Sequence, residues 1–155
     1  MKLTQDLREF VASLTSRRAE FLVVGAHAVA YHGYPRFTGD IDLWVRPTLE
    51  NATRVLEALV SFGFGGLGLT LDDFVAPGKV VQLGYPPSRI DLLTSISGVT
   101  FDEAWDDRVH GLLDGLPVDY LSLAALVRNK RASGRTKDLA DLERLIPDSS
   151  DRETP

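Results

Sequence analysis

Residues 37–45 read FTGDIDLWV, a short apolar segment that contains two aspartates. In a β-strand, successive side chains point to opposite faces, so this segment would have one apolar face and one face that carries Asp40, Asp42 and Trp44. Aspartate is depleted in strands. A solvated outer face would explain the two acids but explains the tryptophan less well, so this face is also a candidate functional site.

The composition is that of an ordinary globular domain. The chain has 155 residues, of which 44% are hydrophobic and 25% charged, so we expect one domain over residues 1–147 and a disordered tail over residues 148–155. The absence of cysteine excludes disulfides, thiolate nucleophiles and cysteine zinc sites. No signal-peptide pattern begins the chain, and no stretch approaches the roughly 18 apolar residues of a membrane span. We therefore expect a cytoplasmic protein with no membrane partner.

The charge distribution is uneven along the chain. The formal net charge is −5, which argues against a protein that wraps itself in phosphate contacts. Residues 127–138 nevertheless read VRNKRASGRTKD, which is a local basic stretch. Its cations either solvate and bridge the ends of two helices, which is the commoner meaning of such a run, or hold a polyphosphate.

Helices and strands alternate along most of the chain. Helical spacing of apolar residues and capping signals predict helices over residues 4–18, 26–32, 48–60 and 101–108, and two more that begin near Ser122 and Thr136. Short apolar runs predict strands at residues 21–24, 40–45, 80–83, 90–93 and 109–113. The sequence GYPPS at residues 84–88 predicts a hairpin, which excludes a purely parallel sheet. The expected class is α/β (α+β), with a mixed β-sheet and flanking helices.

A third acid interrupts a later apolar strand. Asp91 stands in RIDLLT, residues 89–94. Asp40 and Asp42 share a strand face at roughly 6.5–7 Å along the strand, and carboxylates that face a common point repel one another unless a proton or a cation lies between them. Hard divalent cations prefer such oxygen ligands. The alternatives are a solvated strand face for the first two acids and an exposed Asp91 paired with Arg89.

Gly25 marks a turn between a strand and a helix in FLVVGAHAVAYHG, residues 21–33. The free N–H groups at a helix start can hold an anion, and a glycine lets a phosphate approach the backbone. A plain tight turn would explain the same residues. The glycine spacings of a P-loop and of a dinucleotide fingerprint are absent.

These motifs, in this order, resemble the nucleotidyltransferase superfamily typified by DNA polymerase beta. Its signature is an apolar strand, a Gly-Gly or Gly-Ser that opens a helix, Asp-x-Asp on the next strand and a third acid on a later strand. Here the corresponding residues are Val24-Gly25-Ala26, Asp40-Ile41-Asp42 and Asp91. Residues 25–45 and 126–145 are more closely similar to small bacterial nucleotidyltransferase-like proteins related to AbiEii-type toxins.

The resemblance implies a polymerase beta-like fold and a metal-dependent transfer of a nucleoside monophosphate. Asp40, Asp42 and Asp91 would be the catalytic, metal-binding residues for two Mg²⁺ ions, with Mn²⁺ as an alternative, and Asp91 would help to deprotonate an acceptor hydroxyl. The nucleoside triphosphate would be bound by Gly25, Ala26, Arg36, Lys130 and Lys137. The acceptor would be RNA or protein, in a toxin–antitoxin setting, and the small chain would act as a homo-oligomer or with a protein partner.

Two other functions remain open on the sequence. Ala26 replaces the second glycine or serine of the signature, so a catalytically inactive nucleotide-binding or protein-interaction module is one alternative. A metal-dependent phosphohydrolase is the other; it fits the carboxylates but not the order of glycine turn and helix.

Overall fold

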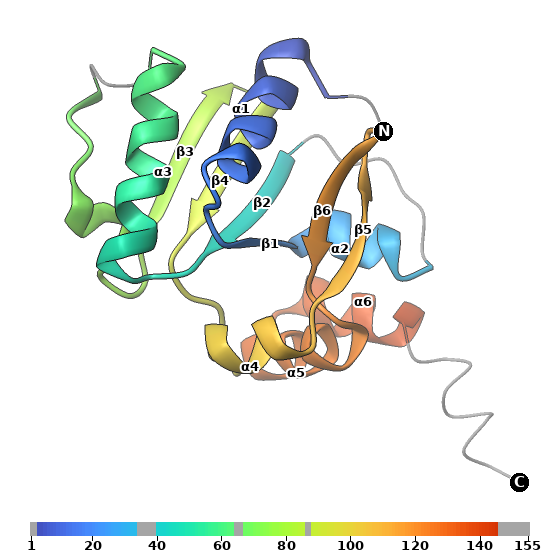
Figure 1. The fold of residues 1–155 in the computed structure, drawn as a ribbon. Helices are drawn as coiled ribbons and strands as arrows, with labels where there is room; N and C mark the ends of the chain where they lie inside the picture. The colour runs from blue at the N-terminus through green and yellow to red at the C-terminus, as the bar shows by residue number, and fades with distance from the viewer. Residues whose placement is uncertain (1–2, 34–39, 64–66, 86–87, 146–155) are drawn as a thin grey trace, which may run out of the picture.

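The computed structural model describes residues 3–33, 40–63, 67–85 and 88–145. Their elements, in chain order, are α1 (Gln5–Ser16), β1 (Phe21–Val24), α2 (Gly25–Tyr31), β2 (Asp40–Val45), α3 (Leu49–Ser61), a 3-10 helix (Leu71–Phe74), β3 (Val80–Tyr85), β4 (Ser88–Leu93), α4 (Phe101–Asp106), β5 (Val109–Leu113), β6 (Leu116–Tyr120), α5 (Leu123–Ser133) and α6 (Thr136–Leu145) (Figure 1).

The sheet has six strands in the order β3-β4-β2-β1-β6-β5. β2 runs antiparallel to β1 and parallel to β4, and β1 runs parallel to β6. The β3–β4 and β5–β6 pairs are antiparallel hairpins. This arrangement confirms the mixed sheet and the hairpin that the sequence predicted around residues 84–88.

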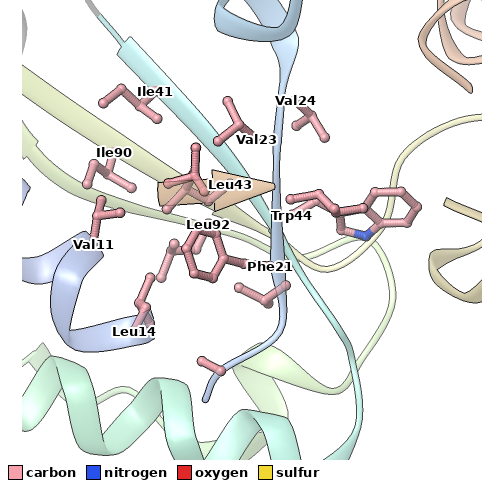
Figure 2. Packing of buried hydrophobic residues seen from close by; sticks show 14 of the residues in the cluster. Val11, Leu14, Phe21, Val23, Val24, Ile41, Leu43, Trp44, Ile90 and Leu92 are labelled. Carbon is pink, nitrogen blue, oxygen red and sulfur yellow. The ribbon is translucent and has the colours of Figure 1, made fainter. Parts of the chain in front are cut away.

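The two faces of β2 have different environments. Ile41 and Leu43 are almost fully buried, and Figure 2 shows them on the same side as Val11 and Leu14 of α1. Trp44 points away from this cluster (Figure 2). Alternation along the strand therefore gives β2 an apolar face under α1 and a second face toward α2, α4 and α5.

Trp44 belongs to the core. Its side chain is 1% exposed, and its ring meets that of Phe101 in α4 edge-to-face, with centroids 5.0 Å apart. Such pairs contribute about 0.5–1.5 kcal/mol beyond the area that they bury. The tryptophan in the opening segment is thus explained by packing beneath α4, and the acids on the same face need a separate explanation.

Helix starts follow the capping chemistry of the sequence. The hydroxyls of Thr48 and Ser122 accept hydrogen bonds from the N–H groups of Asn51 and Ala125, as N-caps do. α6 begins at Thr136 itself, so its cap position falls one residue earlier than predicted. Among the described helices, none is long and apolar enough to cross a membrane.

The strand β6 was not predicted from the sequence. It pairs with β5 across Asp114 and Gly115, which both have positive φ (49° and 80°), and Asp-Gly is a strong hairpin signal. Pro117 obscured the strand because proline cannot donate a ladder hydrogen bond. It is tolerated because β1 pairs with β6 at Tyr120, three residues farther along.

Candidate functional site

Three predicted acids lie on one face of the sheet. In the parallel β2–β4 pair, Asp42 stands directly opposite Asp91, and Asp40 stands opposite Arg89. Asp40 and Asp42 are two residues apart on β2 and so share this face. Asp91 is only 8% exposed, so it is not the solvated acid of the alternative interpretation.

Arg89 joins two of these acids. Its Nη2 lies 2.9 Å from Oδ2 of Asp40, and it also donates a hydrogen bond of 3.2 Å to Oδ2 of Asp91. Its Nε lies 2.9 Å from Oδ1 of Asp91, although these two buried atoms form no hydrogen bond of acceptable geometry with any described residue. The pairing with Arg89 and the gathering of the acids, which the sequence presented as alternatives, therefore occur together.

Gly25 packs directly against Asp42. It has φ = +66°, a conformation that glycine adopts without strain. A Cβ at this position would lie 2.3 Å from Oδ2 of Asp42. The turn into α2 therefore lies against the central acid of the cluster, and both its backbone conformation and its lack of a side chain are needed there.

We expect Gly25→Ala to reduce activity strongly and to destabilise the fold, because the methyl group would displace the Asp42 carboxylate. Gly78→Ala is the matched control: Gly78 has a similar φ of +74°, but nothing lies within 4 Å of its added Cβ. In each variant, backbone strain should lower the free energy of unfolding by roughly 1–2 kcal/mol, which chemical denaturation measures. Equal losses of activity in the two variants would contradict a specific role for the Gly25–Asp42 contact.

The pKa of Asp42 is raised to about 6. The main cause is burial, and the negative charges of Asp91 and Asp40 act in the same direction. The cations Lys137 and Arg89 partly oppose them. Burial and the two neighbouring carboxylates thus both disfavour a negative charge on Asp42, and a bound cation would relieve that effect.

A cleft of about 570 Å³ opens beside these acids. One wall is formed by the sheet and the start of α2, and the other by α5 and the turn that follows it. The lining includes Gly25, Asp42, Asp91, Ser95, Ser97, Asn129, Lys130, Ser133 and Arg135. Its volume and its hydroxyl, amide and guanidinium groups suit a polar, phosphate-bearing ligand.

Lys130 lies in the wall of this cleft and is 5% exposed. Its Nζ lies 2.9 Å from Oδ1 of Asp138 and 3.2 Å from Oδ2 of Asp141, and both aspartates are almost fully buried. The ammonium group that the sequence assigned to phosphate is thus already paired with two carboxylates. This network joins α5 to α6 behind the cleft.

Asp138 is held in its ionised form. Burial acts to raise its pKa, but hydrogen bonds from Arg135, Ser133 and Lys130 outweigh that effect and hold the pKa well below its ordinary value. Nε of Arg135 donates to Oδ2 of Asp138 over 2.7 Å. The carboxylate therefore fixes Arg135 at the cleft. The sequence offered Arg135 only as one cation of the basic stretch over residues 127–138 and did not single it out.

A magnesium ion needs hard oxygen ligands in near-octahedral geometry. Asp40, Asp42 and Asp91 supply hard oxygen ligands, and Oδ1 of Asp91 is buried without a hydrogen bond from a described residue. Within the described ranges, no three acidic or histidine side chains are already gathered around one metal position; Arg89 lies between two of them. The donors fit the ion in kind, and Arg89 contacts oxygens of two of them in this structure.

The remaining predicted residues differ in their placement. Ala26 is the second residue of α2, directly after Gly25. Lys137 is exposed on α6, and its charge reaches Asp42. Arg36 lies outside the described residues. Arg89 was noted in the sequence only as a partner of Asp91; its spacing of two residues from that acid was the available signal that both share the site face.

Comparison with solved structures identifies the same fold in several proteins. The antibiotic-resistance factor ANT(2'')-Ia matches with a TM-score of 0.58 and 15% identity, over 92% of this chain and 82% of its own. A candidate nucleotidyltransferase from Thermotoga maritima matches with a TM-score of 0.58 and 16% identity, over 92% and 91%. The lincosamide antibiotic adenylyltransferase LnuA matches with a TM-score of 0.52 and 13% identity, over 94% and 98%.

The fold is therefore the nucleotidyltransferase fold, a mixed sheet with flanking helices. No protein-family model and no curated protein matches the sequence. At identities of 13–16%, the likeness establishes the fold, and the activity has to be argued from the site.

Proposed function

We propose that this protein is a metal-dependent nucleotidyltransferase that transfers a nucleoside monophosphate from a nucleoside triphosphate to an acceptor hydroxyl. The observation that carries the proposal is the alignment of Asp42 with Asp91 across β2 and β4, directly against the Gly25 turn. This alignment supports a site in which carboxylates and a phosphate-accepting backbone share one cleft. The fold likeness supports the same class of reaction.

In this proposal, Asp40, Asp42 and Asp91 hold two Mg²⁺ ions, with Mn²⁺ as an alternative. When bound, the metal supplies charge neutralisation for the attacking and the leaving oxygens. Asp91 accepts the proton of the acceptor hydroxyl. The hydroxyl oxygen forms a bond to the α-phosphorus, the bond from that phosphorus to the bridging oxygen breaks, and pyrophosphate leaves.

The nucleotide is oriented by groups around the acids. The backbone N–H groups of Gly25 and Ala26 face the triphosphate, as suits a helix start with no side-chain cap. The loss of a hydroxyl at Ala26 removes one phosphate contact but leaves the backbone donors in place. Arg135 and Lys137 supply positive charge at the cleft, and Arg36 is a further candidate from the sequence.

The acceptor and the setting are proposed from the resemblances. The AbiEii-type resemblance favours RNA or protein as acceptor, in a toxin–antitoxin system in the cytoplasm, with a second copy or a protein partner completing the acceptor site. Two fold neighbours are described with adenylyl-2''-tobramycin and with lincomycin. Small hydroxylated molecules are therefore a second class of acceptor to be tested.

The proposed activity predicts label transfer in the presence of Mg²⁺. The protein is incubated with each of the four α-labelled triphosphates and with separate pools of cellular RNA, cellular protein and hydroxylated small molecules. We expect label in one pool together with stoichiometric pyrophosphate, and neither product with EDTA. Nucleotide binding without pyrophosphate release in every pool would instead support the inactive module, and release of free phosphate from simple esters would support a phosphohydrolase.

A further inference from the structure

Arg89 contacts two of the three acids of the site directly, namely Asp40 and Asp91. It stands opposite Asp40 in the β2–β4 register and two residues before Asp91 on the same strand. Its guanidinium lies 2.9 Å from a carboxylate oxygen of each of these acids. The side chain is 24% exposed, so solvent only partly screens the two ion pairs.

The position of Arg89 conflicts with a bound divalent ion. Mg²⁺ takes its oxygen ligands at about 2.0–2.1 Å in near-octahedral geometry. An ion at that distance from Asp40 and Asp91 would share their oxygens with the guanidinium and would be repelled by its charge. The same two acids therefore cannot serve Arg89 and a metal ion fully at the same time.

The pairing is also imperfect in a way that allows release. Arginine and carboxylate pair best through two parallel N–H···O bonds. Here Nε of Arg89 and Oδ1 of Asp91 lie 2.9 Å apart, yet neither forms a hydrogen bond of acceptable geometry with a described residue. One buried donor and one buried acceptor are thus poorly satisfied, which lowers the cost of separating them.

We propose that Arg89 is a tethered counter-cation that holds Asp40 and Asp91 together in the metal-free protein and competes with the divalent metal for them. The inference rests on the proposed function, since it concerns the same acids. It assigns Arg89 a positioning role: the residue lowers metal affinity, maintains the acids in register on one face and stabilises the sheet before the metal binds.

The test compares Arg89→Gln and Arg89→Lys with the native protein and with Arg54→Gln. Arg54 is a matched control because it is also paired with a carboxylate, that of Glu50 in α3, at 2.8 Å, and lies outside the candidate site. Mn²⁺ is titrated alone and followed by electron paramagnetic resonance. Thermal unfolding is recorded in EDTA, where no metal contributes to stability.

We expect Arg89→Gln to bind Mn²⁺ about tenfold more tightly than the native protein, within the usual range for coupled sites. In EDTA its melting temperature should fall by about 2–4 °C, the shift that corresponds to one lost ion-pair contribution in a chain of this size. Arg89→Lys keeps the charge but loses the planar fork, so both of its values should lie between those of the native protein and Arg89→Gln. Arg54→Gln should leave Mn²⁺ affinity unchanged.

Unchanged or weaker Mn²⁺ binding by a folded Arg89→Gln would overturn the inference. If that variant does not fold, native-like Mn²⁺ affinity in Arg89→Lys would overturn it. Where the native protein binds Mn²⁺ and releases pyrophosphate, such a result removes only the competing role of Arg89. Where neither the native protein nor any variant binds Mn²⁺, the metal-dependent function and the inference both fail.

Discussion

Asp42→Asn should abolish pyrophosphate release and, at the same time, make the metal-free protein more stable at neutral pH. The amide keeps the shape of the carboxylate but removes the charge that the site needs, so we expect activity to fall by at least about 10³-fold, equivalent to several kcal/mol of transition-state stabilisation. The gain in stability follows from burial and from the like charges of Asp91 and Asp40, which raise the pKa of Asp42 to about 6.

The sign of the pH dependence follows from that raised pKa. The folded protein binds the Asp42 proton more tightly than the unfolded chain, so this group favours the fold below pH 4 and that contribution is lost as the pH rises through about 6. Asp42→Asn has no carboxyl group at this position, so this pH-dependent loss of stability should be absent in the variant. At pH 8 in EDTA, we expect the variant to be about 1–3 kcal/mol more stable than the native protein.

Urea unfolding at pH 4.5, 6 and 8 in EDTA, together with a pyrophosphate assay in Mg²⁺, measures both effects. Asp107→Asn is the control, because Asp107 is an exposed residue at the end of α4, and it should change neither activity nor the pH profile. A variant that is inactive but less stable at pH 8 would show that Asp42 is a structural acid. A variant that stays active would remove Asp42 from the proposed site.

Lys130→Met should be strongly destabilising. The substitution removes the ammonium group that lies between Asp138 and Asp141, both about 1% exposed. Removing one partner of a buried ion pair typically costs about 3–5 kcal/mol, because the other charge stays buried. We expect a loss of about 3 kcal/mol in chemical denaturation, with the melting temperature lower by about 6–12 °C.

A second substitution separates charge from packing in this network. In Lys130→Met/Asp141→Asn one of the two buried carboxylate charges that faced the ammonium group is removed as well, so about 1 kcal/mol or more of the loss should return. Lys79→Met, at an exposed position, should change stability by less than about 0.5 kcal/mol. If Lys130→Met kept its stability but weakened nucleotide binding more than tenfold, Lys130 would be the phosphate ligand that the sequence suggested rather than part of the structural link between α5 and α6.

Much of the architecture could be read from local patterns. Alternation in residues 40–45 and the proline pair in GYPPS gave a mixed sheet with a hairpin, as observed. The shared face of Asp40 and Asp42 follows from the two-residue period of a strand. That Asp91 stands opposite Asp42 depended on β4 being the neighbour of β2, which only the superfamily resemblance suggested.

The parts that could not be read depend on contacts between distant segments. Lys137 and Asp141 are four residues apart, which is the spacing of an ion pair on a helix, whereas tertiary packing places Asp141 beside Lys130 of the preceding helix. The sequence alone does not decide whether Trp44 lies at the edge of a cleft or in the core, and its contact with Phe101 of α4 decides for the core. In each case, the side chain had two local explanations, and the partner that decided between them lay elsewhere in the chain.

The β2–β4 pairing also has a consequence for folding. Asp42 and Asp91 are 49 positions apart, and α3, the 3-10 helix and β3 lie between them in the chain. Loop closure over such a separation is entropically costly, and long-range strand pairing is slow relative to helix formation. The acids therefore meet only when β2 and β4 have paired, so we expect the concentrated negative charge of the site to form later than the helices.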